Sequence, residues 1–260
     1  MTPQFEDLTF TVDDDMVATV EIHRAPNNFF DIALIQAMAD IYRTLDDDPA
    51  CRAIVLCSEG KHFCAGADFA GQSQVQRVGT GQGNQLYVEA VRLFAARTPV
   101  VAAVQGGAIG GGLGLACSAD FRVAAPEARF AANFSRLGFH HGFGLSATLP
   151  RIVGNQHALD MLYTGRRVPG TEAATMGLCD RLVPLDQVRA EAHALAADIA
   201  RSAPLAVRSI RETMRGDLAE QVRQATAREN KEQDWLRQTE DWNEGVRASA
   251  ERREPHFVGR

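Results

Sequence analysis

Two short, continuously apolar runs, Ala53–Cys57 and Val100–Val104, restrict the fold most, because each is followed by a segment of small residues. Continuous apolar runs of this length suit strands that are covered on both faces, as in a parallel sheet. The segments that follow read HFCAGAD over residues 62–68 and GGAIGGGLGLACSAD over residues 106–120. Since glycine and alanine leave the backbone uncovered, both segments can bring N–H groups close to a ligand. The second segment also opens a helical stretch, whose free N–H groups favour negative charge.

Strand and helix patterns alternate over the first 200 residues, which predicts the α/β class. Further strands are predicted at Met16–His23 and Phe121–Ala125, and helices where apolar residues recur on one face, around residues 34–45 and 86–94. Residues 201–260 differ: they carry 12 Lys/Arg and 11 Asp/Glu, and long helical patterns follow Pro204. We therefore expect a core with the active site over residues 1–200 and a C-terminal α-helical region for oligomerisation over residues 201–260. Gly71–Gly83 predicts a mobile surface loop.

Composition excludes several classes of protein. The net charge of −6 without a basic stripe argues against a nucleic-acid partner. No apolar run approaches the roughly 18–20 residues that span a bilayer, and the first residues show no secretory signal, so no membrane association is expected. The five cysteines lack C-x-x-C spacing and indicate a reducing, cytoplasmic location. No Cys/His cluster has zinc spacing, so no metal site is expected.

The two small-residue segments carry a resemblance. A-G-A-D after a strand, then a G-x-A-x-G-G-G run about forty residues later, is similar to the signature of the enoyl-CoA hydratase/isomerase (crotonase) family. Other matches extend over nearly the whole chain, and their ordered set is specific although no single piece is. These matches are Arg24–Pro26, Phe130, Leu137–Gly138, Leu149–Gly154, Leu162–Gly165, Ala173–Gly177, Glu240–Gly245 and Arg253–Phe257.

The resemblance implies a crotonase-like spiral of ββα repeats with a C-terminal α-helical region. It implies a homotrimer or a dimer of trimers, and an acyl-CoA thioester as substrate. Coenzyme A is then part of the substrate, and no further cofactor is expected. Matching positions place the N–H groups of an oxyanion hole on Ala67 and Gly111. The substrate and its CoA group are expected to contact Ala65, Gly66, Asp68, Phe69 and Gly110, and also Gly114 and Phe134.

Two positions depart from the hydratase pattern. Hydratases of this family use two glutamates around a water molecule, and the matching positions here are Gly114 and Phe134. Neither residue can transfer a proton, and a general acid or base typically contributes 10²–10⁴-fold to the rate. Hydration through two carboxylates is therefore not expected, and a glycine at one position and a phenylalanine at the other predict a roomier, more apolar pocket.

Other side chains are considered as replacements for the glutamates. His140 and His141 follow the second missing glutamate, and histidine is a residue type that often serves as a catalytic acid or base, so at least one of them is a candidate for that role. Asp68 lies beside Ala67, where relatives use an aspartate for structure. Glu89 is expected on a solvated helix face, and His62 either in the CoA groove or on the surface.

Three functions remain open at this level. The first is an acyl-CoA lyase or isomerase that works through a thioester enolate. The second is cleavage, formation or rearrangement of a C–C bond in a bulkier CoA ester, for which the roomier pocket would provide space. The third is a non-catalytic acyl-CoA-binding protein that retains the oxyanion hole but has lost its acids.

Overall fold

The computed structural model describes residues 7–67 and 85–260, and its larger sheet has the strand order β1-β2-β3-β4-β6-β9. β1 is antiparallel to β2, and each of the other neighbouring pairs is parallel. The six strands are β1 (Leu8–Val12), β2 (Val17–Ile22), β3 (Ala53–Ser58), β4 (Val100–Val104), β6 (Phe121–Ala124) and β9 (Arg181–Leu182). The strands expected from the sequence are thus confirmed, and β1 and β9 are additions.

A smaller sheet has the order β5-β7-β8, with β5 at Gly107–Ile109, β7 at Arg129–Ala131 and β8 at Val168–Pro169. Isolated bridges from Cys64 to Ala108 and from Ala67 to Phe30 continue its pattern. The chain therefore passes repeatedly from the larger sheet, through an extended segment beside the smaller one, into a helix. These repeats are the ββα turns of a crotonase-like spiral, as expected.

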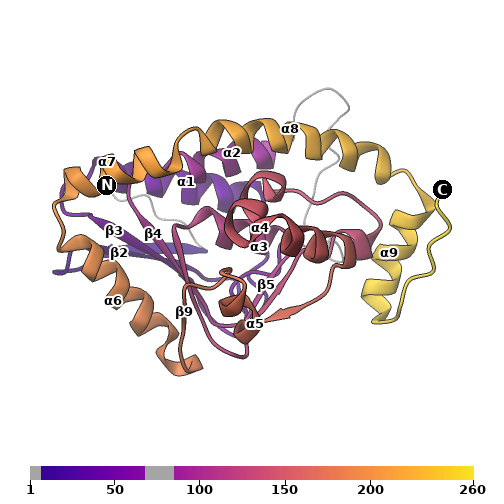
Figure 1. The fold of residues 1–260 in the computed structure, drawn as a ribbon, viewed down its shortest axis with the longest axis horizontal. Helices are drawn as coiled ribbons and strands as arrows, with labels where there is room; N and C mark the ends of the chain where they lie inside the picture. Colours follow the sequence, from indigo (N-terminus) through magenta and orange to yellow (C-terminus); the bar gives the residue numbers. More distant parts are fainter. Residues whose placement is uncertain (1–6, 68–84) are drawn as a thin grey trace.

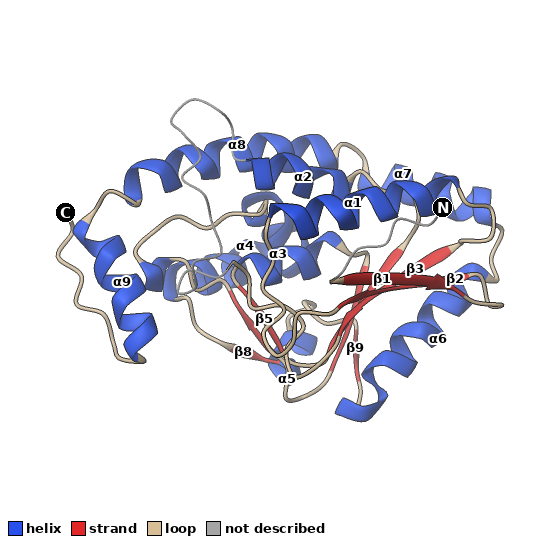
Figure 2. Cartoon of the chain, turned by 180° about the vertical axis from the view of Figure 1, so that it is seen from behind, coloured by secondary structure: helices blue, strands red, loops and turns tan. Residues whose placement is uncertain are grey.

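Both faces of the larger sheet are covered, as the apolar runs predict. All six residues of β3 are buried; Ile54 and Leu56 pack with the main core, whereas Val55 and Cys57 pack with α6 (Val188–Ala200) on the other face. Figure 2 shows α6 on one side of the sheet, with α1 (Ile32–Asp47) and α2 (Gln85–Phe94) on the opposite side. The other core helices are α3 (Gly111–Ser118), α4 (Leu145–Thr164) and α5 (Gly170–Thr175), with short 3-10 turns at Ser135–Leu137 and Leu185–Gln187.

The C-terminal region consists of helices in the described structure: α7 (Pro204–Arg215), α8 (Leu218–Leu236) and α9 (Glu240–Glu251). Figure 1 shows α7 and α8 running along the side of the molecule that carries α1 and α2, with α9 at the far end. Helix α8 contacts both α2 and α4. The tail therefore packs closely on its own core.

One buried ionic cluster ties this tail to the core. Asp120, which follows α3, accepts hydrogen bonds from Arg211 Nε (2.9 Å) and Arg215 Nε (2.8 Å), both on α7. It also accepts one from the Val100 N–H (2.8 Å) at the start of β4. Burial opposes ionisation of Asp120, but the two guanidinium groups and the N–H outweigh it and hold its pKa below the usual value.

All five cysteines are free and buried, which fits thiols that act as small apolar side chains. None of the helices in residues 7–67 and 85–260 is both long and apolar enough to cross a membrane.

Candidate active site

The two small-residue segments lie side by side in the fold. The Cys64 N–H donates to the Gly107 carbonyl (3.0 Å), and the Ile109 N–H donates to the Cys64 carbonyl (3.0 Å). A Cβ at Gly112 would lie 2.0 Å from the Cys64 oxygen. Glycine is therefore required here because one backbone passes directly over the other.

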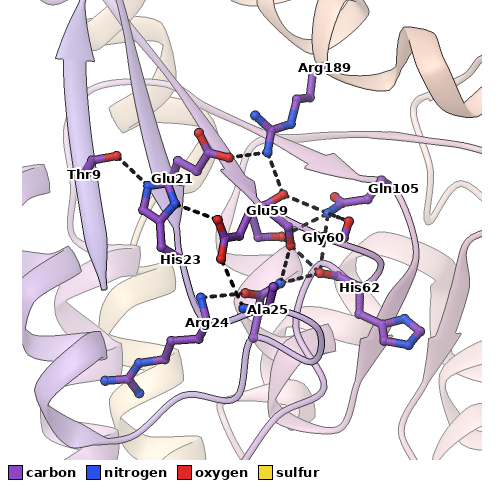
Figure 3. Close-up of polar contacts among 12 residues, drawn as sticks. Thr9, Glu21, His23, Arg24, Ala25, Glu59, Gly60, His62, Gln105 and Arg189 are labelled. Carbon is purple, nitrogen blue, oxygen red and sulfur yellow. Dashed lines mark hydrogen bonds and ion pairs between the residues drawn. The ribbon is translucent and has the colours of Figure 1, made fainter. Parts of the chain in front are cut away.

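His62 forms a further link between these segments. Its Nδ1 accepts a hydrogen bond from the Gly107 N–H (3.1 Å), so the ring is neutral at this nitrogen and lies against the second segment. Its carbonyl accepts from Asn28 Nδ2 (2.6 Å), and Gln105 Nε2 reaches the carbonyls of Ser58 (2.9 Å) and Gly60 (3.3 Å) in the same turn (Figure 3). The structure thus gives His62 a role in holding the turn that leads into Ala65–Ala67.

The stability of the protein is expected to depend on the protonation of His62. Burial lowers the pKa of His62, and Lys61 and Arg167 lower it further. A depressed folded-state pKa contributes stability above the unfolded value of about 6.5, and this stability is lost as the pH falls through the folded value. In His62→Asn, an amide oxygen can accept from Gly107 without titrating. Urea unfolding at about pH 7.5 and about pH 5 measures the free energy of unfolding of both proteins. Between these two pH values the wild type should lose more of that free energy than His62→Asn does. Equal losses in the two proteins would contradict this role of His62.

Ala67 and Gly111, the two expected oxyanion residues, lie at one cavity. Both residues line it, and in the described part of the chain neither N–H donates to a protein acceptor. Gly66, with φ +86°, brings the first segment so close that a Cβ there would lie 3.3 Å from the Gly111 nitrogen. Gly111 is the first residue of α3, so the positive end of that helix dipole points to the same place.

The cavity measures about 260 Å³ and is lined mostly by apolar side chains. Among the described residues, no Asp, Glu, Lys, Arg or His lines it. The lining includes Ala65, Gly66 and Gly110, which are expected to contact substrate or CoA, and the two expected oxyanion residues, Ala67 and Gly111. Phe134, at the second missing glutamate, also lines it. The other lining residues are Phe29, Phe30, Leu86, Tyr87, Asn133, Leu137, Phe139, Phe143, Gln233, Val246, Ser249 and Ala250.

Gly114, at the first missing glutamate, does not line this cavity. A Cβ at Gly114 would lie 2.6 Å from Phe143 Cβ and 2.8 Å from its ring, so Phe143 occupies the space that a longer side chain would need. The expectation that Gly114 contacts substrate and makes the pocket roomier is therefore corrected. Phe143 itself has φ +60°, and its ring packs against Phe30 with the centroids 5.4 Å apart.

Helix α8 holds Phe143 in this strained conformation. Glu229, fully buried on α8, accepts hydrogen bonds from the N–H groups of Gly144 and Ser146 (both 2.9 Å), which flank the start of α4. Burial raises the pKa of Glu229, although these two N–H groups oppose the shift. The turn over Gly114 is thus fixed by a residue more than eighty positions away in the sequence.

The two candidate histidines lie outside the cavity. His140 and His141 stack with their ring centroids 4.1 Å apart and line a separate surface hollow with Tyr163 and Leu236. Burial and the neighbouring His140 lower the pKa of His141 to about 3, so His141 is neutral at physiological pH. His141 Nε2 lies 2.8 Å from Ser146 Oγ. A catalytic role for either histidine stays a prediction that this geometry does not favour.

Other expected positions are placed as follows. Asp68, Phe69 and the segment Gly71–Gly83 lie outside the described residues. Glu89 is buried rather than solvated, since it accepts hydrogen bonds from Gln85 Nε2 (3.0 Å) and Arg92 NH1 (2.5 Å) within α2. Residues 1–200, where the active site is expected, do not supply the whole cavity wall, because α8 and α9 contribute Gln233, Val246 and Ser249.

Four polar side chains that line the cavity are not among the residues predicted from the sequence: Tyr87, Asn133, Gln233 and Ser249. Asn133 could have been found, because it directly precedes the second missing glutamate position. Tyr87 lies on a helix that the sequence predicts, but nothing in the neighbouring sequence indicates that this side chain reaches the cavity. Gln233 comes from the charged tail, where helical periodicity gives no sign of which polar residue is buried.

One cluster outside this cavity has metal-binding residue types. In the described ranges, Asp13, Asp15 and His193 have potential ligand atoms within 4.8 Å of one another. Asp13 Oδ1 already accepts from the N–H groups of Asp15 (3.0 Å) and Val17 (3.1 Å), and Oδ2 lies 2.6 Å from His193 Nε2. These hydrogen bonds stabilise the turn between β1 and β2, and they explain why the three residues lie together.

Comparisons with known proteins agree with this geometry. A profile of the family described as enoyl-CoA hydratase/isomerase matches residues 13–260. A putative enoyl-CoA hydratase of Thermus thermophilus is 37% identical over 233 residues, which cover 87% of this chain and 89% of that protein. A crotonyl-CoA hydratase of Syntrophomonas wolfei is 32% identical over 223 residues, with 85% and 86% covered.

Solved structures show the same fold. The crystal structure of an enoyl-CoA hydratase/isomerase from Pseudoalteromonas atlantica matches with a TM-score of 0.87 at 29% identity, covering 97% of this chain and 100% of that chain. An enoyl-CoA hydratase from Mycobacterium avium gives a TM-score of 0.85 at 26% identity, covering 98% and 100%. The architecture described above, together with these structural matches, is the crotonase fold. Within that fold, the chain belongs to the enoyl-CoA hydratase/isomerase family.

Proposed function

We propose that this chain binds an acyl-CoA thioester and stabilises the enolate formed from it, with the N–H groups of Ala67 and Gly111 donating to the thioester oxygen. The observation that carries the proposal is that both residues line one cavity and that neither N–H has a protein acceptor among the described residues. Fixed donors directed at developing negative charge are often the largest single contribution to catalysis. The N-terminus of α3 adds a favourable potential at the same point.

The lining of the cavity favours enolate chemistry over hydration by two carboxylates. Gly114 is covered by Phe143, and Phe134 presents a ring where the second glutamate would lie. An apolar surrounding strengthens the hydrogen bonds that the two N–H groups can make to an enolate oxygen. The reaction we propose is therefore of the lyase or isomerase type, such as double-bond migration or C–C bond cleavage, with no cofactor beyond the CoA of the substrate.

Hydration remains the second candidate, because the relatives include a protein named crotonyl-CoA hydratase. It would need a water molecule to be activated without acids at positions 114 and 134. Asp68, next to Ala67, lies outside the described residues, and its part in proton transfer stays a prediction.

One experiment separates these candidates. Purified protein is incubated in D₂O with a panel of saturated and 2-enoyl-CoA esters; α-deuteration is followed by mass spectrometry and hydration by loss of the enoyl absorbance. We expect α-deuteration of at least one saturated ester without addition of water to the 2-enoyl esters. Loss of the enoyl absorbance together with a mass gain of one water molecule would favour hydration, whereas loss without that mass gain would indicate double-bond migration. Calorimetric binding of the esters with neither reaction would indicate the non-catalytic acyl-CoA-binding protein and overturn the proposed enzyme.

We also propose that the chain forms a homotrimer or a dimer of trimers. Leu205, Ile210 and Met214 on α7 are 80%, 63% and 70% exposed. Large apolar side chains gathered on one helix are typical of a surface that another protein covers. Size-exclusion chromatography with light scattering would measure the assembly, and a monomer at micromolar concentration would contradict it.

A further inference from the structure

Tyr87 and Gln233 form a polar pair in the otherwise apolar cavity. Tyr87 comes from α2 and Gln233 from α8; they are 8% and 1% exposed, and both line the cavity. Tyr87 Oη donates to Gln233 Oε1 at 3.1 Å. Because buried polar atoms are costly unless they are hydrogen-bonded, a pair in this position is informative about what the cavity accommodates.

The hydrogen bonds of this pair leave one donor and one acceptor unused among the described residues. Tyr87 Oη uses its hydrogen on Gln233 Oε1 and has two lone pairs, of which the nearby Phe143 N–H can occupy one. Gln233 Oε1 also accepts from Arg237 NH2 (3.1 Å), and Nε2 donates one hydrogen to the His140 carbonyl (3.0 Å). What remains is a lone pair on Tyr87 Oη and the second N–H of Gln233.

The backbone at Gly142 leaves room for the hydroxyl of Tyr87. A Cβ at Gly142 would lie 1.8 Å from Tyr87 Oη and 2.7 Å from Gln233 Nε2, so position 142 can hold only glycine beside the pair. Burial raises the pKa of Tyr87, so the phenol stays protonated and neutral at physiological pH. Tyr87 is therefore suited to hydrogen bonding rather than to removing a proton.

We propose that Tyr87 and Gln233 recognise a hydroxyl group on the acyl chain, so that the preferred substrates are hydroxyacyl-CoA esters. A hydroxyl both donates and accepts, which matches the free acceptor on Tyr87 and the free donor on Gln233. The phenylalanine rings around the pair contact the hydrocarbon part of the acyl group. This inference rests on the proposed acyl-CoA binding and deepens it by naming a substrate class.

Calorimetry with hexanoyl-CoA, and with its isomers hydroxylated at each carbon from the third to the sixth, tests the proposal. Because a net hydrogen bond contributes about 1 kcal/mol, we expect the wild type to bind one isomer at least about tenfold more tightly than hexanoyl-CoA. Tyr87→Phe should reduce this preference to about threefold or less, with both affinities measured in the same variant. Gln233→Glu, which removes the donor but keeps the size, should also reduce it.

The matched control is Tyr163→Phe, which removes a phenolic hydroxyl from a residue that is 75% exposed and outside the cavity. It should keep the full preference. If hexanoyl-CoA binds but no isomer is preferred, or the preference survives in both Tyr87→Phe and Gln233→Glu, hydroxyl recognition is overturned and the proposed function stands. If no ester binds to the wild type, both proposals fail. Circular dichroism of each variant identifies a failure to fold. If one of the two variants fails to fold, the preference measured in the other decides whether the pair recognises the hydroxyl.

Discussion

Replacing Gly111 by proline is expected to lower kcat on the best acyl-CoA substrate by about 10²–10³-fold, the usual effect of removing one oxyanion donor. Proline lacks the N–H that we propose to hold the enolate oxygen. Gly111 is the first residue of α3, and proline is well accepted at the first position of a helix. The substitution therefore removes the donor without breaking the helix. Steady-state kinetics with the substrate found in the D₂O experiment would measure the change.

The control for this substitution must account for Phe30. A Cβ at Gly111 would lie 2.4 Å from Phe30 Cζ, so any side chain there pushes on that ring. Gly111→Ala adds the same Cβ but keeps the N–H, and both variants can be made in a Phe30→Leu background that provides room. The ratio of kcat between the alanine and proline variants then reports on the N–H and on the ring carbon that replaces its hydrogen, with the effect of the Cβ removed. Equal activity in the two would show that Gly111 is not an oxyanion donor.

Replacing Asp120 by asparagine is expected to destabilise the protein by about 3–5 kcal/mol, the usual cost of removing one partner from a buried ion pair. The guanidinium groups of Arg211 and Arg215 would remain buried without their counter-charge. Because the folded-state pKa of Asp120 is depressed, its stabilisation is present above the unfolded value of about 3.9 and is lost as the pH falls through the folded value. Urea unfolding at neutral and acidic pH would measure both effects.

Asp198→Asn provides a matched comparison, since Asp198 pairs with Arg201 at an exposed position on the protein surface. An exposed ion pair of this kind contributes about 0–1 kcal/mol, so the variant should unfold almost like the wild type. If the two substitutions cost the same, the cluster at Asp120 does not attach α7 to the core in the way described.

The sequence allowed the order of strands and helices and the two backbone segments of the site to be predicted, because these depend on local patterns. Ala53–Cys57 and Val100–Val104 are strands, and the glycines after them lie where the two backbones meet. The filling of the space beside Gly114 could not be predicted in this way. It is occupied by Phe143, 29 positions later, in a turn fixed by Glu229 on α8. The spacing of apolar residues indicates which face of a helix or strand is buried, but it does not indicate which distant side chain fills a gap beside that face.

The same reason explains why Gln233 was overlooked. Charged residues dominate its part of the sequence, so the helix there was expected to serve contacts between subunits. In the structure, this helix also packs on α2 and α4 and presents Gln233 to Tyr87. The partner that makes Gln233 informative lies 146 residues earlier, beyond the reach of any local pattern.

The cavity takes its walls from Phe29 near one end of the sequence and from Ala250 near the other. During synthesis, the ribosome releases the chain from its N-terminus onwards, so the two small-residue segments leave the ribosome well before α8 and α9. Until then the acyl pocket lacks one side and is open to water. Under the proposed function, a nascent chain would therefore be unable to act on CoA esters until α9 has been made.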